Sequence, residues 1–298
     1  MNRKFIYFIN PISGTKNKEA VLALIKERTA KAGIPFEILH TNAAADYGFL
    51  KEKIKADKIT DIIICGGDGT VNQVAGSLIG TDVNIGIIPL GSGNGLALAA
   101  GIPRNPSKAL DIIFKGNASY IDGFFINQKF SCMLCGLGFD ALVAHEFAAH
   151  PSRGLNTYVK LTLKNFLSAS FYPFTITTNG TNITTEAFFI SIANSNQFGN
   201  NFTIAPKASL SDGLLDIVIV NRMSRLKMLY AIMKQVRLGK VEPASGKLRK
   251  GSIQYIQAKK IEIKNPAQAP LHIDGDPAAT SLHFSIDIAE KAFRLLQP

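Results

Sequence analysis

The chain has 298 residues, of which 46% are hydrophobic and 18% are charged, and its net charge is +11 at pH 7. This composition supports a folded core rather than a disordered chain, and the length suits two domains. Its three cysteines argue against a disulfide framework. No run reaches the ~18 uncharged apolar residues of a membrane span, and the apolar run after the basic N-terminus is too short for a signal peptide. These features predict a cytoplasmic protein.

The first third of the chain alternates between strand-like apolar runs and helical patterns. The expected strands are Lys4–Ile9, Phe36–His40, Asp61–Cys65 and Asn84–Ile88. The expected helices are Lys18–Ala32, Asp46–Ala56, Val71–Leu78, Leu96–Ala100 and Pro106–Phe114. Such alternation predicts a mostly parallel sheet covered on both faces, with ligands bound at the carboxyl ends of the strands.

Glycine-rich turns follow three of these strands. They are Asn10-Pro11-Ile12-Ser13-Gly14, Gly66-Gly67-Asp68-Gly69-Thr70 and the turn from Pro89 to Gly95. A glycine turn that leads into a helix offers backbone N–H groups to a phosphate. Asp68 would repel that phosphate unless a metal ion or a transferred proton is involved, which favours phosphoryl transfer over passive nucleotide binding. The P-loop and Rossmann fingerprints are both missing from the sequence.

From about Tyr120 onward, short strand-like segments joined by turns predominate. The expected strands are Phe124–Ile126, Lys129–Leu134, Phe174–Thr178, Glu186–Ala193, Leu215–Val220, Ser252–Ile256, Lys260–Ile263, Leu271–Ile273 and Leu282–Ile286. The expected helices are Ala141–Ala149, Leu155–Ser168, Leu226–Leu238 and Ala289–Leu296. Asn179-Gly180 is a hairpin signal. We therefore expect an α/β domain at residues 1–122 and a β-rich sandwich at 123–287, with 288–298 packing back on the first domain.

Two acidic turns lie in this second part. Asp212 and Asp216 bracket Gly213 at the start of a strand, and Asp274-Gly275-Asp276 follows the strand Leu271–Ile273. Acids around a glycine are common in ordinary turns. They also supply oxygen ligands for a hard cation, or a general base. Both interpretations stay open on the residues alone.

A basic stretch runs from Arg222 to Lys260, with eleven lysines and arginines against one acid, Glu242. It predicts either a solvated face or a surface for an anionic partner. The helix expected at Leu226–Leu238 has apolar residues on one side, which suits core packing or contact with a membrane. No basic run is interleaved with aromatic residues as in single-strand binding proteins, so we expect no nucleic-acid partner.

Six motifs together resemble one family. They are Asn10-Pro11-Ile12-Ser13-Gly14, Gly66-Gly67-Asp68-Gly69-Thr70, Gly91-Ser92-Gly93-Asn94, Gly136-Leu137-Gly138-Phe139-Asp140-Ala141, Asp212-Gly213-Leu214-Leu215-Asp216 and Asp274-Gly275-Asp276. Their order is that of the diacylglycerol kinase catalytic-domain family, which includes soluble bacterial lipid kinases and sphingosine kinases. The resemblance covers almost the whole chain. It implies an ATP-dependent lipid kinase that uses Mg²⁺, with a nucleotide domain similar to those of NAD kinases and phosphofructokinases and a β-sandwich completing the cleft.

The resemblance also implies roles for individual residues. The residues implied to contact ATP are Asn10, Pro11, Ser13, Gly14, Thr41, Gly66, Gly67, Asp68, Gly69, Thr70, Asn72, Gln73, Gly91, Ser92, Gly93 and Asn94. Asp68 would organise Mg²⁺ and phosphate, and Asp140 would lie in the substrate site. Asp276 would accept the proton of the lipid hydroxyl, with Asp274 as the alternative. A structural Mg²⁺ would be held by the backbone of Ser209 and Leu214 and the carboxylate of Asp212.

Two positions depart from the family's pattern. Bacterial members usually have Asn-Asp where this chain has Asn94-Gly95, and the last acid of their Asp-Gly-Glu motif is here Asp276. The alternative functions are a kinase of a soluble acceptor, similar to NAD kinases, and a catalytically impaired lipid-binding homologue. The expected partners are ATP and a membrane lipid, with transient contact at an anionic inner-membrane surface. The residues leave the lipid acceptor and a homodimer open.

Overall fold

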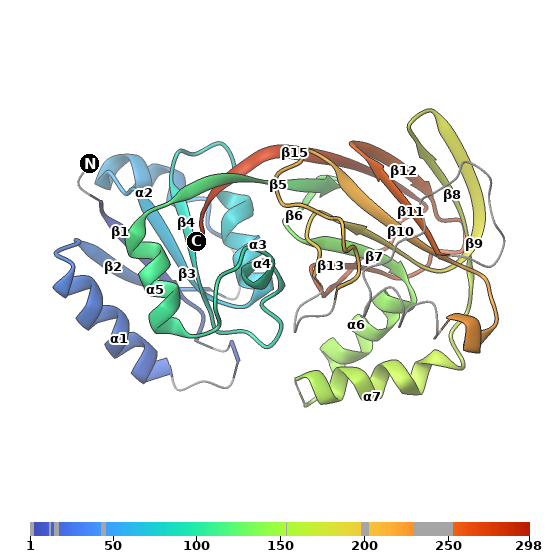
Figure 1. Ribbon diagram of the computed structural model, residues 1–298, viewed down its shortest axis with the longest axis horizontal. Coiled ribbons are helices and arrows are strands. Elements are labelled where there is room, and N and C mark those ends of the chain that lie inside the picture. The colour runs from blue at the N-terminus through green and yellow to red at the C-terminus, as the bar shows by residue number, and fades with distance from the viewer. Residues whose placement is uncertain are drawn as a thin grey trace. The chain divides into compact units, whose positions relative to one another are not determined.

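The computed structural model describes residues 3–11, 13–14, 18–42, 46–152, 154–197, 203–228 and 253–298. The chain divides into two compact units, Met1–Asp122 with Lys291–Pro298, and Gly123–Glu290. It passes between them twice, within strand β5 (Ala118–Ile126) and within strand β15 (His283–Leu296) (Figure 1). We refer to them as the first unit and the second unit.

The first unit is built on a parallel sheet with the strand order β2-β1-β3-β4-β15. Its strands are β1 (Phe5–Ile9), β2 (Phe36–His40), β3 (Asp61–Gly66), β4 (Asn84–Pro89) and the last part of β15. β1 and β3 are buried along their whole length. This is expected for strands covered on both faces, which read as unbroken apolar runs. The strands predicted for β1 to β4 are confirmed to within one residue at each end.

Five helices are described in the first unit. They are α1 (Lys18–Lys31), α2 (Leu50–Asp57), α3 (Asp68–Ser77), α4 (Gly95–Ala99) and α5 (Pro106–Lys115). Right-handed crossovers place α1 on one face of the sheet and α2 and α3 on the other. α5 lies beside α1 (Figure 1), and the Asn105 side chain caps its first turn by accepting the Lys108 N–H at 3.1 Å.

The N-terminal edge of this sheet is closed by a buried ion pair. The guanidinium of Arg3 donates to both carboxylate oxygens of Asp61, at 2.6 and 3.1 Å, and to the carbonyl of Ile113 at 2.7 Å. Asp61 is fully buried and also accepts from Asn84 Nδ2 at 3.1 Å. Because this end is filled by its own side chains, the polar turns at the opposite, carboxyl ends of the strands are the edge available to a ligand.

The last strand corrects a prediction. Residues Ala289–Leu296 were expected to form a helix, but they belong to β15, whose Arg294 and Leu295 pair in parallel with Asn84 and Ile85 of β4. Alanine, glutamate, lysine and leucine favour a helix locally. The exposed edge of β4 offers backbone partners that a local pattern does not reveal. Lys291 takes a positive φ of 53° and donates its N–H to Asp122 Oδ1 at 2.7 Å, which marks an irregularity in the strand.

Several further boundaries differ from the expected ones. The helix expected from Asp46 begins at Leu50, because Asp46 is held in a turn by Asn42 Oδ1 and by the Gly48 N–H. The strand expected at Lys129–Leu134 is two strands, β6 (Lys129–Ser131) and β7 (Leu134–Gly138). The break between them wraps around a buried carboxylate, which is described below.

The second unit is a β-sandwich, as predicted. Its other strands are β8 (Tyr172–Thr178), β9 (Thr181–Ala193), β10 (Leu215–Asn221), β11 (Ile253–Ala258), β12 (Lys260–Lys264), β13 (Leu271–Ile273) and β14 (Asp276–Ala278). The first half of β9 pairs with β8 across the hairpin predicted at Asn179-Gly180, and its second half pairs with β7 and β10. Alternate residues of these strands form one apolar core that includes Phe174, Ile190 and Ile217.

Two helices accompany the sandwich, α6 (Phe139–Ala149) and α7 (Leu155–Phe166), and they pack on each other. Most of the helix expected at Leu226–Leu238, and most of the basic stretch, lie outside the described residues. Among the residues that are described, none of the helices has the length and apolar character needed to cross a membrane.

Candidate active site

Three glycine turns meet at the carboxyl edge of the sheet in the first unit. Gly66 O accepts the Leu90 N–H at 2.9 Å, joining the turns after β3 and β4. A Cβ added to Gly67 would lie 3.1 Å from the Cα of Gly91, and a Cβ on Gly14 would overlap the carbonyl of Leu90. The three turns therefore pack main chain against main chain, which only glycine permits at these approaches.

Asp68 lies at the centre of this arrangement. It is the first residue of α3, after Gly67 at the N-cap position. The sequence pattern predicted that this helix begins at Val71. The structure begins it three residues earlier, so Gly69 and Thr70 are helical rather than part of the turn. The backbone N–H groups of a first helical turn have no partner inside the helix. Asp68 Oδ1 accepts the Leu96 N–H at 3.3 Å, so this carboxylate links the turn after β3 to α4.

The turn after β1 is tied to α3 by side chains. Asn10 Nδ2 donates to Thr70 Oγ1 at 2.7 Å, and Ser13 Oγ donates to the carbonyl of Asn10 at 3.2 Å. Thr41, which follows β2, donates its N–H to Ile9 O at 3.1 Å. Asn10, Ser13, Thr41 and Thr70 thus lie at one edge of the sheet. Pro11 and Gly14 of the same turn are exposed, as is Gln73 of α3, whereas Asn72 is half-buried.

Asn94 shapes the turn after β4. Its backbone is left-handed, with φ 55°, and its side chain is 3% exposed. Asn94 Oδ1 accepts the Gly91 N–H at 2.9 Å and Nδ2 donates to Gly91 O at 2.7 Å, so both ends of the amide bind the turn itself. Ser92 is left exposed at the tip. The observed role of Asn94 is to hold the conformation of Gly91, Ser92 and Gly93.

Arg104 is a residue at this edge that the sequence pattern did not identify. Its Nη2 donates to the carbonyl of Gly93 at 2.9 Å, and the residue is exposed. The interaction crosses ten residues of chain, so no local motif marks it. A guanidinium beside this glycine turn adds positive charge where an anionic ligand would lie.

In the second unit, the carboxylate of Asp274 is fully occupied by hydrogen bonds to neighbouring residues of the fold. Its carboxylate is buried and accepts from Ser131 Oγ at 2.7 Å and from the backbone N–H groups of Cys132, Met133 and Leu134. These bonds explain the break between β6 and β7. A carboxylate that accepts from several backbone donors is held in one position, so Asp274 is a structural group.

Asp276 has a different environment. Asp274 and Gly275 form a two-residue turn with φ values of 51° and 86°, and Ile273 pairs with Asp276 across it. Positive φ at both turn positions is typical of a tight hairpin. Asp276 is therefore the first residue of β14, and it is exposed. Of the two acids, Asp276 is the one that solvent and a substrate can reach.

Asp140 and His272 form a buried pair next to this turn. His272 Nε2 lies 3.3 Å from Asp140 Oδ2, and His272 Nδ1 accepts the Gly275 N–H at 3.3 Å. Because Nδ1 is an acceptor, the proton of a neutral ring is on Nε2, which donates to Asp140. A Cβ on Gly136 would overlap both Asp140 Oδ2 and His272 Nε2. The sequence did not predict His272 as part of the site, since nothing in its local pattern marks the contact with Asp140.

The turn expected to hold a structural cation has suitable oxygen chemistry. Asp212 Oδ1 accepts the Leu214 N–H at 3.1 Å, and Gly213 between them has a φ of 71°. Burial, opposed by a hydrogen bond from Tyr255 and reinforced by Asp212, raises the pKa of Asp216 to about 6. Asp216 Oδ2 has no hydrogen-bond partner among the described residues. An orphaned buried carboxylate oxygen fits a hard cation, although no cluster of three acidic, histidine or cysteine ligands occurs in the described part of the chain.

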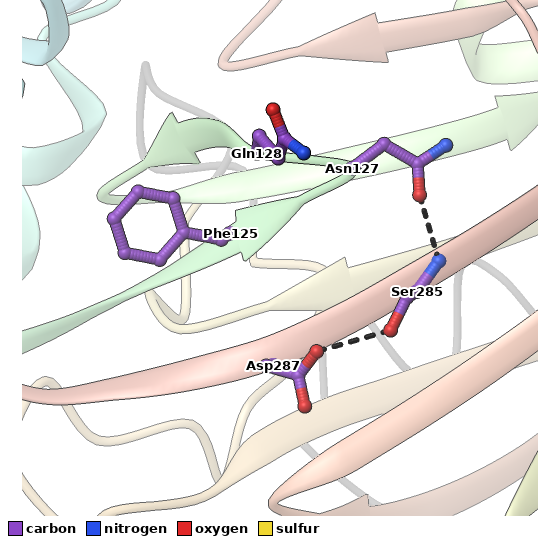
Figure 2. Close-up of a pocket in the computed structure, with 5 residues that line it drawn as sticks. All are labelled: Phe125, Asn127, Gln128, Ser285 and Asp287. Atoms are coloured by element: carbon purple, nitrogen blue, oxygen red, sulfur yellow. Dashed lines mark hydrogen bonds between the residues drawn. The ribbon is translucent and has the colours of Figure 1, made fainter.

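A cavity of about 600 Å³ lies elsewhere in the second unit. Figure 2 shows its five lining residues, Phe125, Asn127, Gln128, Ser285 and Asp287. Ser285 donates its N–H to Asn127 Oδ1 and its hydroxyl to Asp287 Oδ2, at 2.8 and 3.0 Å. None of the predicted site residues is among them. These hydrogen bonds join Asn127, Ser285 and Asp287 to one another and occupy polar groups that a ligand would otherwise use.

Two known families match this chain. A family described as "Diacylglycerol kinase catalytic domain" matches residues 4–126. A second, described as "YegS C-terminal NAD kinase beta sandwich-like domain", matches residues 134–297.

Curated relatives extend this similarity. A protein named "Diacylglycerol kinase" from Mycobacterium tuberculosis is 28% identical over 97% of this chain and 93% of its own length. A protein named "Probable lipid kinase YegS-like" from Chromohalobacter salexigens is 26% identical over 87% of this chain and 84% of its own length. An uncharacterized Synechocystis protein is 30% identical over 75% of this chain, which spans 54% of that longer relative.

Solved structures show the same fold. A crystal structure described as diacylglycerol kinases from Bacillus anthracis str. Sterne superposes with a TM-score of 0.75 at 22% identity, covering 99% of this chain and 97% of that one. Another chain from the same organism gives a TM-score of 0.80 at 22% identity, covering 99% and 96%.

Proposed function

The chain belongs to the diacylglycerol kinase catalytic-domain family, and we propose that it is an ATP-dependent kinase that transfers the γ-phosphoryl group to a lipid hydroxyl. The named relatives support a kinase of this family. The observation that carries the proposal furthest is the meeting of three glycine turns with Asp68 at the start of α3.

ATP would bind along this edge of the first unit. Main-chain N–H groups of the glycine turns and of the first turn of α3 supply donors for phosphate oxygens without placing side chains in the way. Polar side chains lie at the same edge: Asn10 and Thr70 are hydrogen-bonded to each other, and Thr41 is bonded through its N–H to Ile9 O. Phosphoryl transfer asks mainly for positioning and charge neutralisation, so a site built from backbone is sufficient for much of the work.

Mg²⁺ would be held near the phosphates by the carboxylate of Asp68 and, as a structural ion, by Asp212 with the backbone of Ser209 and Leu214. Bound there, the ion would offset the negative charge of the phosphates. Asp68 is half-buried beside the turns, and Asp212 is exposed next to the orphaned oxygen of Asp216. Asp68 itself positions α4 through the Leu96 N–H.

Asp276 would accept the proton of the lipid hydroxyl as the new P–O bond forms. Its exposure suits this role, whereas the carboxylate of Asp274 accepts from four donors in the segment Ser131 to Leu134. Asp140 stays our proposed substrate-site residue, beside His272 and the turn that carries Asp276.

Labelled ATP and mixed-lipid vesicles test this function directly. We expect the native chain to label a lipid, and Asp68→Asn and Asp276→Asn each to lower the rate by about a hundredfold. Asp111→Asn, an exposed acid on α5, is the matched control and should retain full activity. Equal labelling by the native chain and both variants would refute the assigned roles.

The alternative acceptor is soluble, as the NAD kinase-like description of the second family suggests. A soluble acceptor would be favoured if the label entered water-soluble compounds and if adding vesicles did not change the rate of transfer. Vesicle binding without any phosphate transfer would favour a catalytically impaired lipid-binding homologue.

A further inference from the structure

One face of α7 is fully used by packing on α6. The rings of Tyr158 and Phe147 meet edge to face at 5.6 Å, and Asn165 Nδ2 donates to Glu146 Oε2 at 2.7 Å. Leu161, between them on the same side, is 8% exposed. These contacts fix the orientation of the helix, so its opposite face is turned to solvent.

That opposite face carries large apolar side chains. Val159, Leu163 and Leu167 are 44%, 66% and 76% exposed, and they recur every four residues through the helix and its C-cap. Residues four apart are neighbours on a helix surface. A surface helix of a globular protein normally turns polar side chains outward and apolar ones to the core. α7 instead has apolar residues on its solvent side, in a continuous stripe.

Two lysines accompany the stripe. Lys160 and Lys164 each follow one of its members, and both are exposed. Lys164 lies 3.7 Å from Glu146, but 70% of its side chain remains accessible. The helix itself contains no aspartate or glutamate. We call Val159, Lys160, Leu163, Lys164 and Leu167 the α7 surface, and its net charge is positive.

A neighbouring segment is anchored beside the C-terminal end of α7. The Arg225 guanidinium lies over the rings of Phe166, Phe171 and Phe188, with centroids at 5.7, 5.0 and 4.9 Å, and donates to Ala169 O. The next residue, Leu226, is 84% exposed. The anchored arginine therefore holds another outward-facing leucine on the same unit.

We propose that the α7 surface docks on a membrane that contains anionic lipids. Leucines at this spacing would enter the boundary between headgroups and acyl chains, while the lysines remain among anionic headgroups. Charge complementarity favours this occupant, because an apolar protein partner would not require lysines along the stripe. The choice of a lipid surface rests on the proposed lipid acceptor, but the docking itself involves neither ATP nor turnover.

Co-sedimentation of the full chain with vesicles, without ATP, tests the docking. The probes are phosphatidylglycerol vesicles and neutral phosphatidylcholine vesicles. Leu163→Gln with Leu167→Gln should weaken binding to the anionic vesicles about tenfold or more, since two exposed leucines no longer enter the lipid. Lys160→Gln with Lys164→Gln should weaken it about fivefold per lysine at low salt, with little effect on neutral vesicles.

Leu282→Gln is the matched control, because Leu282 is 51% exposed on the same unit but lies outside the α7 surface. It should bind vesicles as the native chain does, and circular dichroism should show every variant folded. Unchanged binding by the double leucine variant would overturn the proposal. The proposal would also be overturned if the double leucine variant lost dimers in sedimentation equilibrium while its vesicle binding was unchanged. That result would assign the stripe to contact with a second copy of the chain.

The outcomes separate this proposal from the proposed function. If docking is correct and the kinase assignment is wrong, the vesicle results stand while no phosphate is transferred. If the kinase assignment is correct and docking is wrong, the double leucine variant phosphorylates vesicle lipid as fast as the native chain. If both are correct, it loses activity on vesicles but keeps activity on a short-chain lipid dispersed in water.

Discussion

The two units position their candidate site residues in different ways, and glycine has a different role in each. In the first unit, Gly14, Gly67 and Gly91 allow main chain to approach main chain, and the groups that we propose for ligand binding are largely backbone N–H. In the second unit, Gly136 instead makes room for two side chains, Asp140 and His272. Glycine thus shapes the backbone in the first unit, whereas in the second unit it leaves room for a hydrogen-bonded pair of side chains.

The largest expected effect tests the second half of this comparison. Gly136→Ala places a Cβ in the space of Asp140 Oδ2 and His272 Nε2, so the pair must separate inside the core. We expect a loss of about 3 kcal/mol in the free energy of unfolding, from overpacking and a broken buried hydrogen bond. Urea denaturation of the variant and the native chain measures it.

The matched control is Gly180→Ala in the hairpin of β8 and β9. A Cβ there meets nothing within 4 Å, and only the positive φ of 71° is unfavourable. The control should lose about 1 kcal/mol. Equal losses for the two variants would show that the Asp140–His272 pair adjusts to the added Cβ and does not require glycine at position 136.

A smaller effect separates the two acids of the second unit. Asp274→Asn replaces a buried carboxylate that accepts four hydrogen bonds, and we expect it to lose about 2 kcal/mol of unfolding free energy. Asp276→Asn, at an exposed position, should change that free energy by less than about 0.5 kcal/mol. Thermal and urea unfolding of both variants measure the difference. A larger loss for Asp276→Asn would reverse the structural and catalytic roles assigned to the pair.

The sequence predicted the parallel strands and the glycine turns because both are local patterns. Apolar runs of strand length and glycines at strand ends need no knowledge of the remaining chain. The last part of β15, Ala289–Leu296, was missed for the opposite reason, since only the free edge of β4 selects a strand for residues with helical propensity.

The candidate site divides in the same way. The Asp-Gly-Asp turn was visible in the sequence, but its two acids have different burial, and that difference comes from a distant segment, Ser131 to Leu134. Asn94 was expected to contact a ligand, yet both ends of its amide bind Gly91. A motif identifies which residues gather at a turn, whereas the hydrogen bonds formed in the fold, both local and long-range, decide which of them hold the turn together.

The smallest expected effect tests the backbone-built site of the first unit through Arg104. Its guanidinium donates to Gly93 O at the tip of the turn after β4, where it both fixes a carbonyl and adds positive charge. Arg104→Gln should weaken ATP binding by about threefold, because an exposed charge contributes below about 1 kcal/mol. Lys108→Gln, another exposed cation on the following helix, is the control and should bind ATP unchanged. Calorimetric titration at low and high salt separates the two contributions of Arg104. A deficit that disappears at high salt assigns it to charge, and one that persists assigns it to the conformation of the turn.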